Sequence, residues 1–246
     1  MKAVALIPAR LGATRFPAKL LAPLKGKSVI LRTYESAKAT GLFSDVVVVT
    51  DSDLIWEEII QAGGKAVKSK REYESGTDRI AEVAADMDAD VFVNVQGDEP
   101  FVQQEPIAQL LQVFKAGDGK DVQVASLVQE LHEEQFISDP NYVKVALDLK
   151  QNAIFFSRSV IPYPRSKAKA TYYEHIGVYA FRKQALMDFT RWPMTPLEEA
   201  EKIECLRFLE HGVPMRMVVT NYMGIEIDTP EDIVRAEAFM EKMSMQ

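Results

Sequence analysis

The chain has 246 residues, 47% of them apolar and 26% charged, with a formal net charge of −7. A chain of this size and composition can bury a core as one domain, which excludes a disordered or fibrous protein. The acidic balance, without a basic stripe, argues against nucleic acid as a partner, although a single nucleotide needs only a local cationic pocket.

The sequence favours a cytoplasmic protein with no membrane partner. No apolar run approaches the roughly 20 residues that span a bilayer, and the apolar start after Lys2 is too short for a secretory signal. The only cysteine, Cys205, cannot form a disulfide within the chain, which fits a reducing compartment.

Apolar, β-branched runs alternate with segments of helical spacing along most of the chain. Strands are expected at residues 3–7, 46–50, 91–95, 122–128, 143–147, 176–181 and 217–219. Helices are expected at residues 28–39, 54–62, 77–87, 105–115, 196–209 and 230–243. Strands that are apolar on both faces and alternate with helices predict an α/β fold, with a mainly parallel central sheet between helical layers.

This alternation weakens after about residue 150, where residues 151–182 show little helical spacing. We expect a single domain over residues 1–246, with a small, partly antiparallel subdomain inserted at about 151–182. Its aromatic residues either form the seam of a homodimer or fill the core of the subdomain itself. They are Phe155, Phe156, Tyr163, Tyr172 and Tyr173.

A cluster of cations follows the first expected strand. Arg10, Arg15 and Lys19 surround Gly12 in a loop that can wrap a polyphosphate, or that is a solvated basic turn. Common nucleotide and hydrolase signatures are absent: the chain has no complete P-loop, no Gly-x-Gly-x-x-Gly and no Gly-x-Ser-x-Gly.

Two segments combine helix capping with residues that a cap does not need. In residues 75–79, Ser75 or Thr77 can cap a helix and Asp78 suits its dipole, which leaves Arg79 for a base or ribose contact. In residues 228–232, the cap and the helix start account for residues 229–232 and leave Asp228 unused.

Asp98 follows the strand expected at residues 91–95, in the turn that begins with Gln96. It is either an ordinary turn residue or an oxygen ligand for Mg²⁺, and Asp228 is the second candidate ligand. Because ligands in open α/β sheets bind beyond the carboxyl ends of strands, we expect the cationic loop and both carboxylates to converge on one edge of the sheet.

Together these segments resemble the 3-deoxy-manno-octulosonate cytidylyltransferase family (CMP-Kdo synthetases). Order and spacing are kept over almost the entire chain, although no single motif is decisive. The segments that carry the resemblance lie at residues 7–19, 50–51, 75–79, 94–100, 139–144, 156–162, 175–179 and 228–232.

The resemblance implies a three-layer nucleotide-diphospho-sugar transferase fold of Rossmann-like type and a homodimer. It also implies a reaction: CTP and an eight-carbon ulosonic acid give the CMP-sugar and pyrophosphate, with Mg²⁺ as cofactor. In that family the product supplies the core of lipopolysaccharide.

Matching motif positions assign roles to individual residues. Arg10, Arg15 and Lys19 hold the CTP phosphates beside Gly12, and Ser75, Thr77, Arg79 and Gln96 recognise cytosine and ribose. Asp98 and Asp228 hold the metal, and with Arg10 and Lys19 they form the catalytic set. The sugar pocket is lined by Arg158, His175, Tyr179, Glu204 and Cys205.

Some of these positions have other interpretations. His175 could equally be a structural histidine at the start of a strand. Cys205 stands where the family usually has a glutamine that faces the sugar, and Ile225-Glu226-Ile227 replaces a more usual Gly-Val before Asp228. These changes are compatible with the branch that acts on the 8-amino analogue of the sugar.

Three other functions remain open from the sequence. The chain could be a nucleotidyltransferase for another sugar, such as a sialic acid or a sugar 1-phosphate. It could be a nucleotide-binding protein that has lost catalysis, or an interaction protein that uses a strand edge in residues 151–182.

Overall fold

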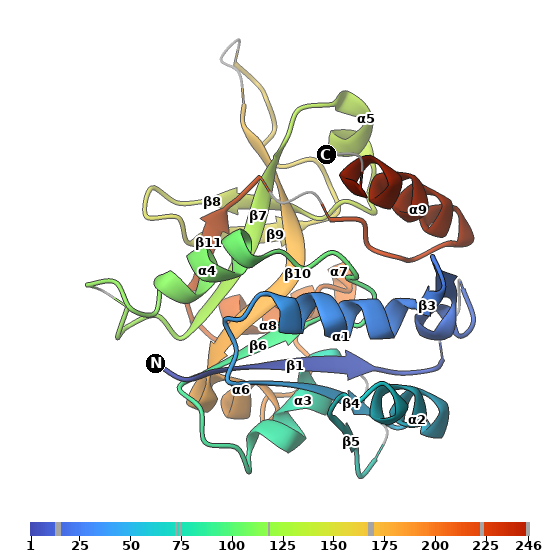
Figure 1. Cartoon of the computed structure of the whole chain (residues 1–246). Helices are drawn as coiled ribbons and strands as arrows, with labels where there is room; N and C mark the ends of the chain where they lie inside the picture. Colours follow the sequence, from blue (N-terminus) through green and yellow to red (C-terminus); the bar gives the residue numbers. More distant parts are fainter. Residues whose placement is uncertain are drawn as a thin grey trace. The chain divides into compact units, whose positions relative to one another are not determined.

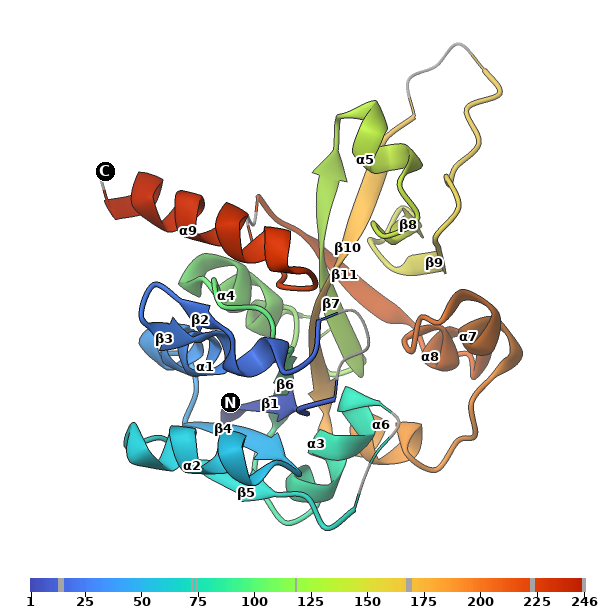
Figure 2. The same ribbon diagram turned by 90° about the vertical axis from the view of Figure 1, so that its right-hand side faces the viewer.

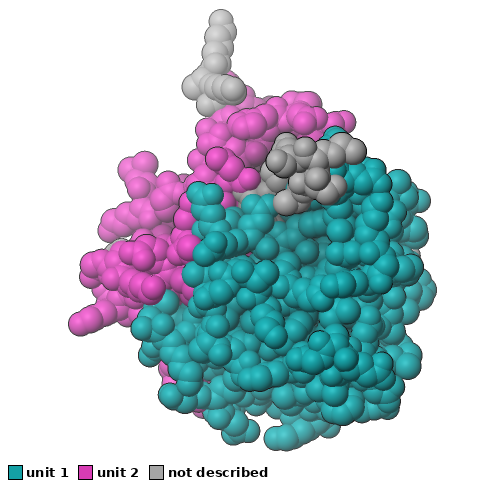
Figure 3. Space-filling view, in the orientation of Figure 1, with its two compact units in different colours: residues 1–107, 223–246 teal, residues 108–222 magenta. Residues whose placement is uncertain are grey.

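The computed structural model describes residues 1–12, 16–71, 73, 75–117, 119–166, 170–221 and 224–244 (Figure 1). Two compact units make up the chain (Figure 3): Met1–Ile107 with Met223–Gln246 form the first, and Ala108–Tyr222 form the second. None of the helices in the described ranges combines the length and the hydrophobicity that a membrane crossing requires.

A parallel four-stranded sheet forms the centre of the first unit. Its order is β6-β1-β4-β5. The strands are β1 (Ala3–Ala9), β4 (Asp45–Thr50), β5 (Ala66–Lys68) and β6 (Val91–Val95). Every residue of β1 is buried, as expected for a strand covered on both faces.

Helices cover both faces of this sheet. α1 (Val29–Ala39) and α2 (Asp53–Gln61) pack on one face, and α3 (Gly76–Ala84) packs on the other (Figure 2). Each begins at a serine whose side-chain oxygen accepts a hydrogen bond from the first turn, as N-cap residues do. These serines are Ser28, Ser52 and Ser75.

The first unit also contains several short elements and the C-terminal helix. They are η1 (Lys19–Leu21), the hairpin of β2 (Pro23–Leu24) and β3 (Lys27–Ser28), and α9 (Pro230–Ser244). α4 (Gln104–Gln112) runs through the point in the sequence where the second unit begins.

The second unit contains a mixed sheet. β10 (Tyr172–Arg182) pairs antiparallel with β7 (Val124–Leu131), and β11 (Met215–Val219) pairs parallel with β7. β8 (Lys144–Leu147) pairs antiparallel with both β10 and β9 (Ala153–Ser157). The helices are α5 (Glu134–Ser138), α6 (Lys183–Phe189), α7 (Pro196–Glu201) and α8 (Leu206–Glu210). The α/β class with a mainly parallel sheet and a smaller antiparallel part is therefore confirmed, and residues 151–182 fall inside this unit.

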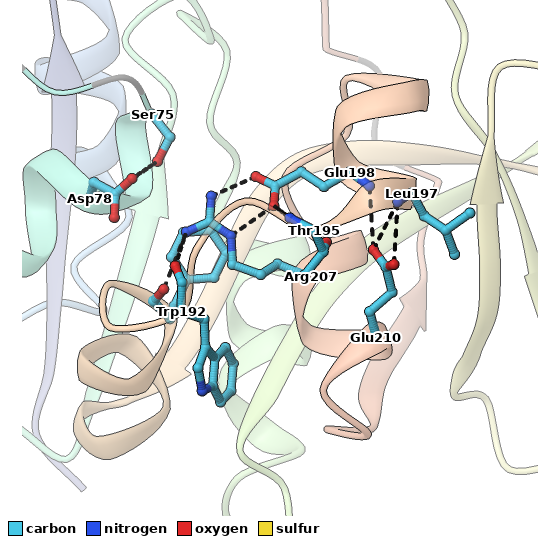
Figure 4. Close-up of polar contacts among 9 residues, drawn as sticks. Ser75, Asp78, Trp192, Thr195, Leu197, Glu198, Arg207 and Glu210 are labelled. Atoms are coloured by element: carbon cyan, nitrogen blue, oxygen red, sulfur yellow. Dashed lines mark hydrogen bonds and ion pairs between the residues drawn. The ribbon is translucent and has the colours of Figure 1, made fainter.

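The single helix expected at residues 196–209 is wrong. α7 ends at Glu201. The next residue, Lys202, has a left-handed backbone with φ 54° and ψ 46°, and α8 starts only at Leu206. The reversal lets the Arg207 guanidinium reach back to Glu198 with two hydrogen bonds of 2.6 and 2.8 Å (Figure 4). Both side chains are buried, so the two helices form one hydrogen-bonded corner.

Candidate active site

A cleft of about 250 Å³ opens in the first unit at the carboxyl ends of β1 and β6. β1 is the strand where the winding reverses: the chain runs outward through β4 and β5, then returns to β6 on the other side of β1. Ligands of open α/β sheets bind at such a switch point. The cleft is lined by Pro8, Ala9, Arg10, Gly12, Lys19, Leu20, Tyr73, Ser75, Gly76, Arg79, Gln96, Gly97, Asp98 and Asp228.

Gly97 lets the two loops that follow β1 and β6 come together. A Cβ atom at this position would lie 2.9 Å from the Pro8 carbonyl oxygen and 3.2 Å from the Leu20 side chain. The hydroxyl of Thr33 donates to the Gly97 carbonyl at 2.9 Å, which fixes the turn that carries Asp98. The floor of the cleft is therefore set by backbone contacts that any larger residue would disturb.

Lys19 bridges two carboxylates that are far apart in the sequence. Its Nζ donates to Asp98 Oδ2 at 2.6 Å and to Asp228 Oδ1 at 2.7 Å. Burial works against the charged ammonium, but the two carboxylates outweigh it, so the pKa of Lys19 is raised. The structure thus brings together three of the four residues that the resemblance assigns to catalysis.

The start of α9 explains why Asp228 faces the cleft. The Asp232 carboxylate accepts hydrogen bonds from the backbone N–H groups of Asp228 and Thr229 and from the Thr229 hydroxyl. The buried Ile227 donates its N–H to the Asp98 carbonyl at 3.0 Å. The capping interpretation is confirmed: the helix start uses Asp232 and leaves the Asp228 side chain for the acidic pair.

Glu226 is a third carboxylate that sequence reasoning did not assign to the site. Asp98, Glu226 and Asp228 each offer an oxygen, and these three atoms lie within 4.8 Å of one another. Desolvation and then repulsion from Asp98, Glu99 and Asp228 raise the pKa of Glu226 well above its ordinary value. Because Glu226 is exposed as a residue, we attribute the shift in its pKa to the neighbouring like charges more than to desolvation. The sequence offered one signal that Glu226 belongs to the site, namely its position two residues before Asp228.

The expected phosphate-binding residues are only partly described. Arg10 is exposed and lines the cleft, whereas Arg15 lies outside the described residues. Gly12 also lines the cleft, but a Cβ atom there would meet nothing within 4 Å among the described residues. Its small size is therefore not demanded by contacts with the described protein.

Three of the four residues expected to bind cytosine and ribose line the cleft, namely Ser75, Arg79 and Gln96. The Arg79 guanidinium donates to Asp51 at 2.9 Å and to Ser69 at 3.0 Å. Ser75 caps α3, since its hydroxyl accepts from the Asp78 N–H and donates to the Asp78 carboxylate (Figure 4).

Thr77 differs from the expectation, because it is not among the residues that line the cleft. It is 1% exposed and accepts a hydrogen bond from the Asn94 amide. Helix periodicity turns Thr77 toward the sheet while Ser75 and Arg79 reach the cleft wall.

The expected sugar-binding residues all belong to the second unit. The Arg158 guanidinium donates hydrogen bonds to the backbone carbonyls of Glu201 at 2.8 Å and Pro140 at 2.9 Å. The Glu201 carboxylate accepts from the Ser157 hydroxyl and the Arg158 N–H. These contacts hold both the guanidinium and the backbone of Arg158.

His175 packs between the rings of Phe156 and Tyr179, with its Nε2 3.0 Å from the Ser126 hydroxyl. Burial lowers the pKa of His175 to about 3, so the ring is neutral at ordinary pH. Tyr179 itself is 7% exposed.

Cys205 and Glu204 do not lie on a helix, because they fall in the connection between α7 and α8. Cys205 is 1% exposed and contacts the Tyr179 side chain, and burial raises the pKa of its thiol well above the ordinary value. The thiol therefore faces the interior of the unit, which differs from the expectation that it lines an open sugar pocket.

Comparison with known proteins extends over almost the whole chain. A family model described as cytidylyltransferase matches residues 4–221. The chain is 57% identical to the 3-deoxy-manno-octulosonate cytidylyltransferase of Flavobacterium johnsoniae, covering 98% of this chain and 99% of that protein. The enzyme of the same name from Christiangramia forsetii is 51% identical, with 96% of each chain covered.

A solved structure has the same fold. It is the structure of CMP:2-keto-3-deoxy-manno-octonic acid synthetase complexed with CTP, which is 36% identical to this chain. The TM-score is 0.93, and the match covers 99% of this chain and 100% of the other.

Proposed function

Because the chain belongs to the 3-deoxy-manno-octulosonate cytidylyltransferase family, we propose that it transfers CMP from CTP to the eight-carbon sugar acid 3-deoxy-manno-octulosonate (Kdo) and releases pyrophosphate. The observation that carries this proposal is the cleft at the switch point of the sheet. There Lys19, Asp98 and Asp228 meet beside Arg10. Cationic groups beside a carboxylate pair are suited to phosphoryl chemistry, because charge on the leaving group must be stabilised.

The reaction forms a bond between the anomeric oxygen of the sugar and the α-phosphorus of CTP. The bond from that phosphorus to the bridging oxygen of the β-phosphate breaks, and pyrophosphate leaves with the electron pair. The proton of the sugar hydroxyl passes to solvent. Arg10 and Lys19 stabilise the negative charge that develops on the phosphates.

The donor set of the cleft fits a magnesium ion. Oxygen atoms of carboxylates are the ligands that Mg²⁺ prefers, and Asp98 and Asp228 present them within the same cluster. We propose that these two residues hold Mg²⁺, which when bound neutralises phosphate charge and increases the acidity of the sugar hydroxyl.

Arg158 is the proposed partner of the sugar carboxylate. A guanidinium presents a planar fork that matches a carboxylate, and its contacts with Glu201 and Pro140 hold it in one place. The neutral His175 is suited to a hydroxyl of the sugar, since an uncharged imidazole both donates and accepts hydrogen bonds. Tyr179 and Glu204 complete this proposed set.

We further propose a homodimer in the cytoplasm that supplies lipopolysaccharide synthesis. Phe156 is fully buried, so it belongs to the core of its own unit, but Tyr163 is 83% exposed and Ile154 is 61% exposed. Exposed apolar side chains of this kind are suited to an interface core. Light scattering at assay concentration should give twice the chain mass, and a monomer would refute the dimer.

Pyrophosphate release in the presence of CTP and Mg²⁺ tests the function directly. The sugar panel should contain Kdo, its 8-amino analogue and a sialic acid. We expect turnover with an eight-carbon sugar, and the ratio of the two eight-carbon rates shows which one the pocket prefers. Turnover with the sialic acid alone, or CTP binding without pyrophosphate release, would refute the proposal.

A further inference from the structure

Three carboxylates and one ammonium meet at the acidic end of the cleft. Lys19 reaches Asp98 and Asp228 at hydrogen-bond distance, and the Glu226 carboxylate lies in the same cluster. Within the described part of the chain, no hydrogen-bond donor reaches the Glu226 carboxylate. The site therefore holds a third carboxylate to which the lysine does not donate.

The backbone contact next to Asp228 also carries Glu226 to the site. Ile227 is fully buried, and its N–H donates to the Asp98 carbonyl at 3.0 Å. Anchored by this central residue, the side chains on either side of it converge with Asp98. The position of Glu226 thus follows from the same docking that brings Asp228 to the site.

The charges of the cluster favour a second cation. Asp98, Glu226 and Asp228 bring three negative charges when ionised, against one positive charge on Lys19. A divalent cation brings this sum to zero, whereas without Glu226 the same ion would leave an excess positive charge until a nucleotide arrived. Repulsion among the three carboxylates is relieved by an ion of this kind.

We propose that Glu226 is a third carboxylate of the cation site, and that it lets this protein take up a divalent cation before the nucleotide binds. The inference rests on the proposed function, because it assigns a new residue to the metal site of Asp98 and Asp228. It also gives Lys19 a second role, since its ammonium occupies the acidic pair and competes with the entering ion.

The test measures Mn²⁺ binding to the full-length protein without nucleotide, by electron paramagnetic resonance of free Mn²⁺. Glu226→Gln should weaken binding roughly tenfold or more. The matched control is Glu231→Gln, which removes the same charge from an exposed position in the first turn of α9 and should change affinity less than about twofold. Lys19→Met should strengthen binding, because the competing ammonium is gone.

Two results would overturn the inference. One is equal Mn²⁺ affinity for the unchanged protein and Glu226→Gln, and the other is Mn²⁺ binding that appears only after CTP is added. Glu226→Ala is measured in parallel, and unchanged circular dichroism in each variant shows that affinity and not folding has altered. Failure of the proposed function has a different signature: the unchanged protein would release no pyrophosphate from CTP with either eight-carbon sugar, whatever its affinity for Mn²⁺.

Discussion

The neutral state of His175 makes a quantitative prediction about acid stability. The ring is packed against Phe156 and Tyr179, and burial lowers its pKa from 6.5 to about 3. In the unfolded chain the imidazole takes up a proton as the pH falls below about 6.5, while in the folded protein it does not. The unfolded state therefore binds more protons, and stability falls with the pH across this window.

The size of the effect follows from the two pKa values. Between pH 6.5 and the folded pKa near 3, one such group removes about 1.4 kcal/mol from the free energy of unfolding per pH unit. At pH 5 the loss is about 2 kcal/mol relative to neutral pH. His175→Gln removes the titrating ring and retains an amide near the position of Nε2, where Ser126 lies at 3.0 Å.

Urea unfolding followed by circular dichroism between pH 7 and pH 5 measures this difference. The free energies of the unchanged protein and His175→Gln should diverge by about 2 kcal/mol over this range, with the unchanged protein losing more. His132→Asn is the control, because the His132 side chain is 73% exposed, and it should keep the full acid dependence. Parallel curves for the unchanged protein and His175→Gln would refute the reasoning that His175 stays neutral.

Three further predictions concern the cleft and the α7–α8 corner. Asp98→Asn or Asp228→Asn should reduce turnover by orders of magnitude while circular dichroism stays unchanged, and a near-normal rate with Mg²⁺ would contradict the metal assignment. Glu198→Gln should destabilise the protein by about 3–5 kcal/mol in urea unfolding, because the buried Arg207 loses its charged partner. An effect below 1 kcal/mol would mean that the pair is solvated. Gly97→Ala should weaken CTP binding in calorimetry, since its Cβ would lie 2.9 Å from the Pro8 carbonyl oxygen, and unaltered affinity would show that the loops adjust.

The sequence predicted the site best where local chemistry decides the structure. The start of α9 is an example: a cap at Thr229 and a carboxylate at Asp232 form a pattern that depends only on neighbouring residues. The cap uses residues 229–232 and has no role for Asp228, which marked Asp228 as a candidate site residue. In the structure, Lys19 donates to both Asp228 and Asp98. The alternation of strands and helices predicted the parallel sheet for the same reason, because periodicity is a local property.

Features that depend on tertiary contacts could not be predicted in this way. Helical spacing continues through residues 196–209, and no glycine or proline marks the break at Lys202. The break is stabilised by the buried pair of Glu198 and Arg207, which only the folded corner brings together. The same corner turns Cys205 inward, so a thiol that motif comparison placed at the sugar is part of the core.

Lys19 takes part in both the proposed binding of phosphate and the proposed metal site. An ammonium has three N–H donors, and two of them point to Asp98 and Asp228 in the structure. The third can donate to a phosphate oxygen without breaking the first two contacts. In the proposed metal site, a divalent ion would take oxygens of the same carboxylates and leave more of the Lys19 N–H donors for phosphate. With Glu226 as the proposed third carboxylate, the acidic end would hold that ion while Lys19 stays in the cleft. The carboxylates that position Lys19 in the cleft are thus the same two that we propose as ligands of the metal.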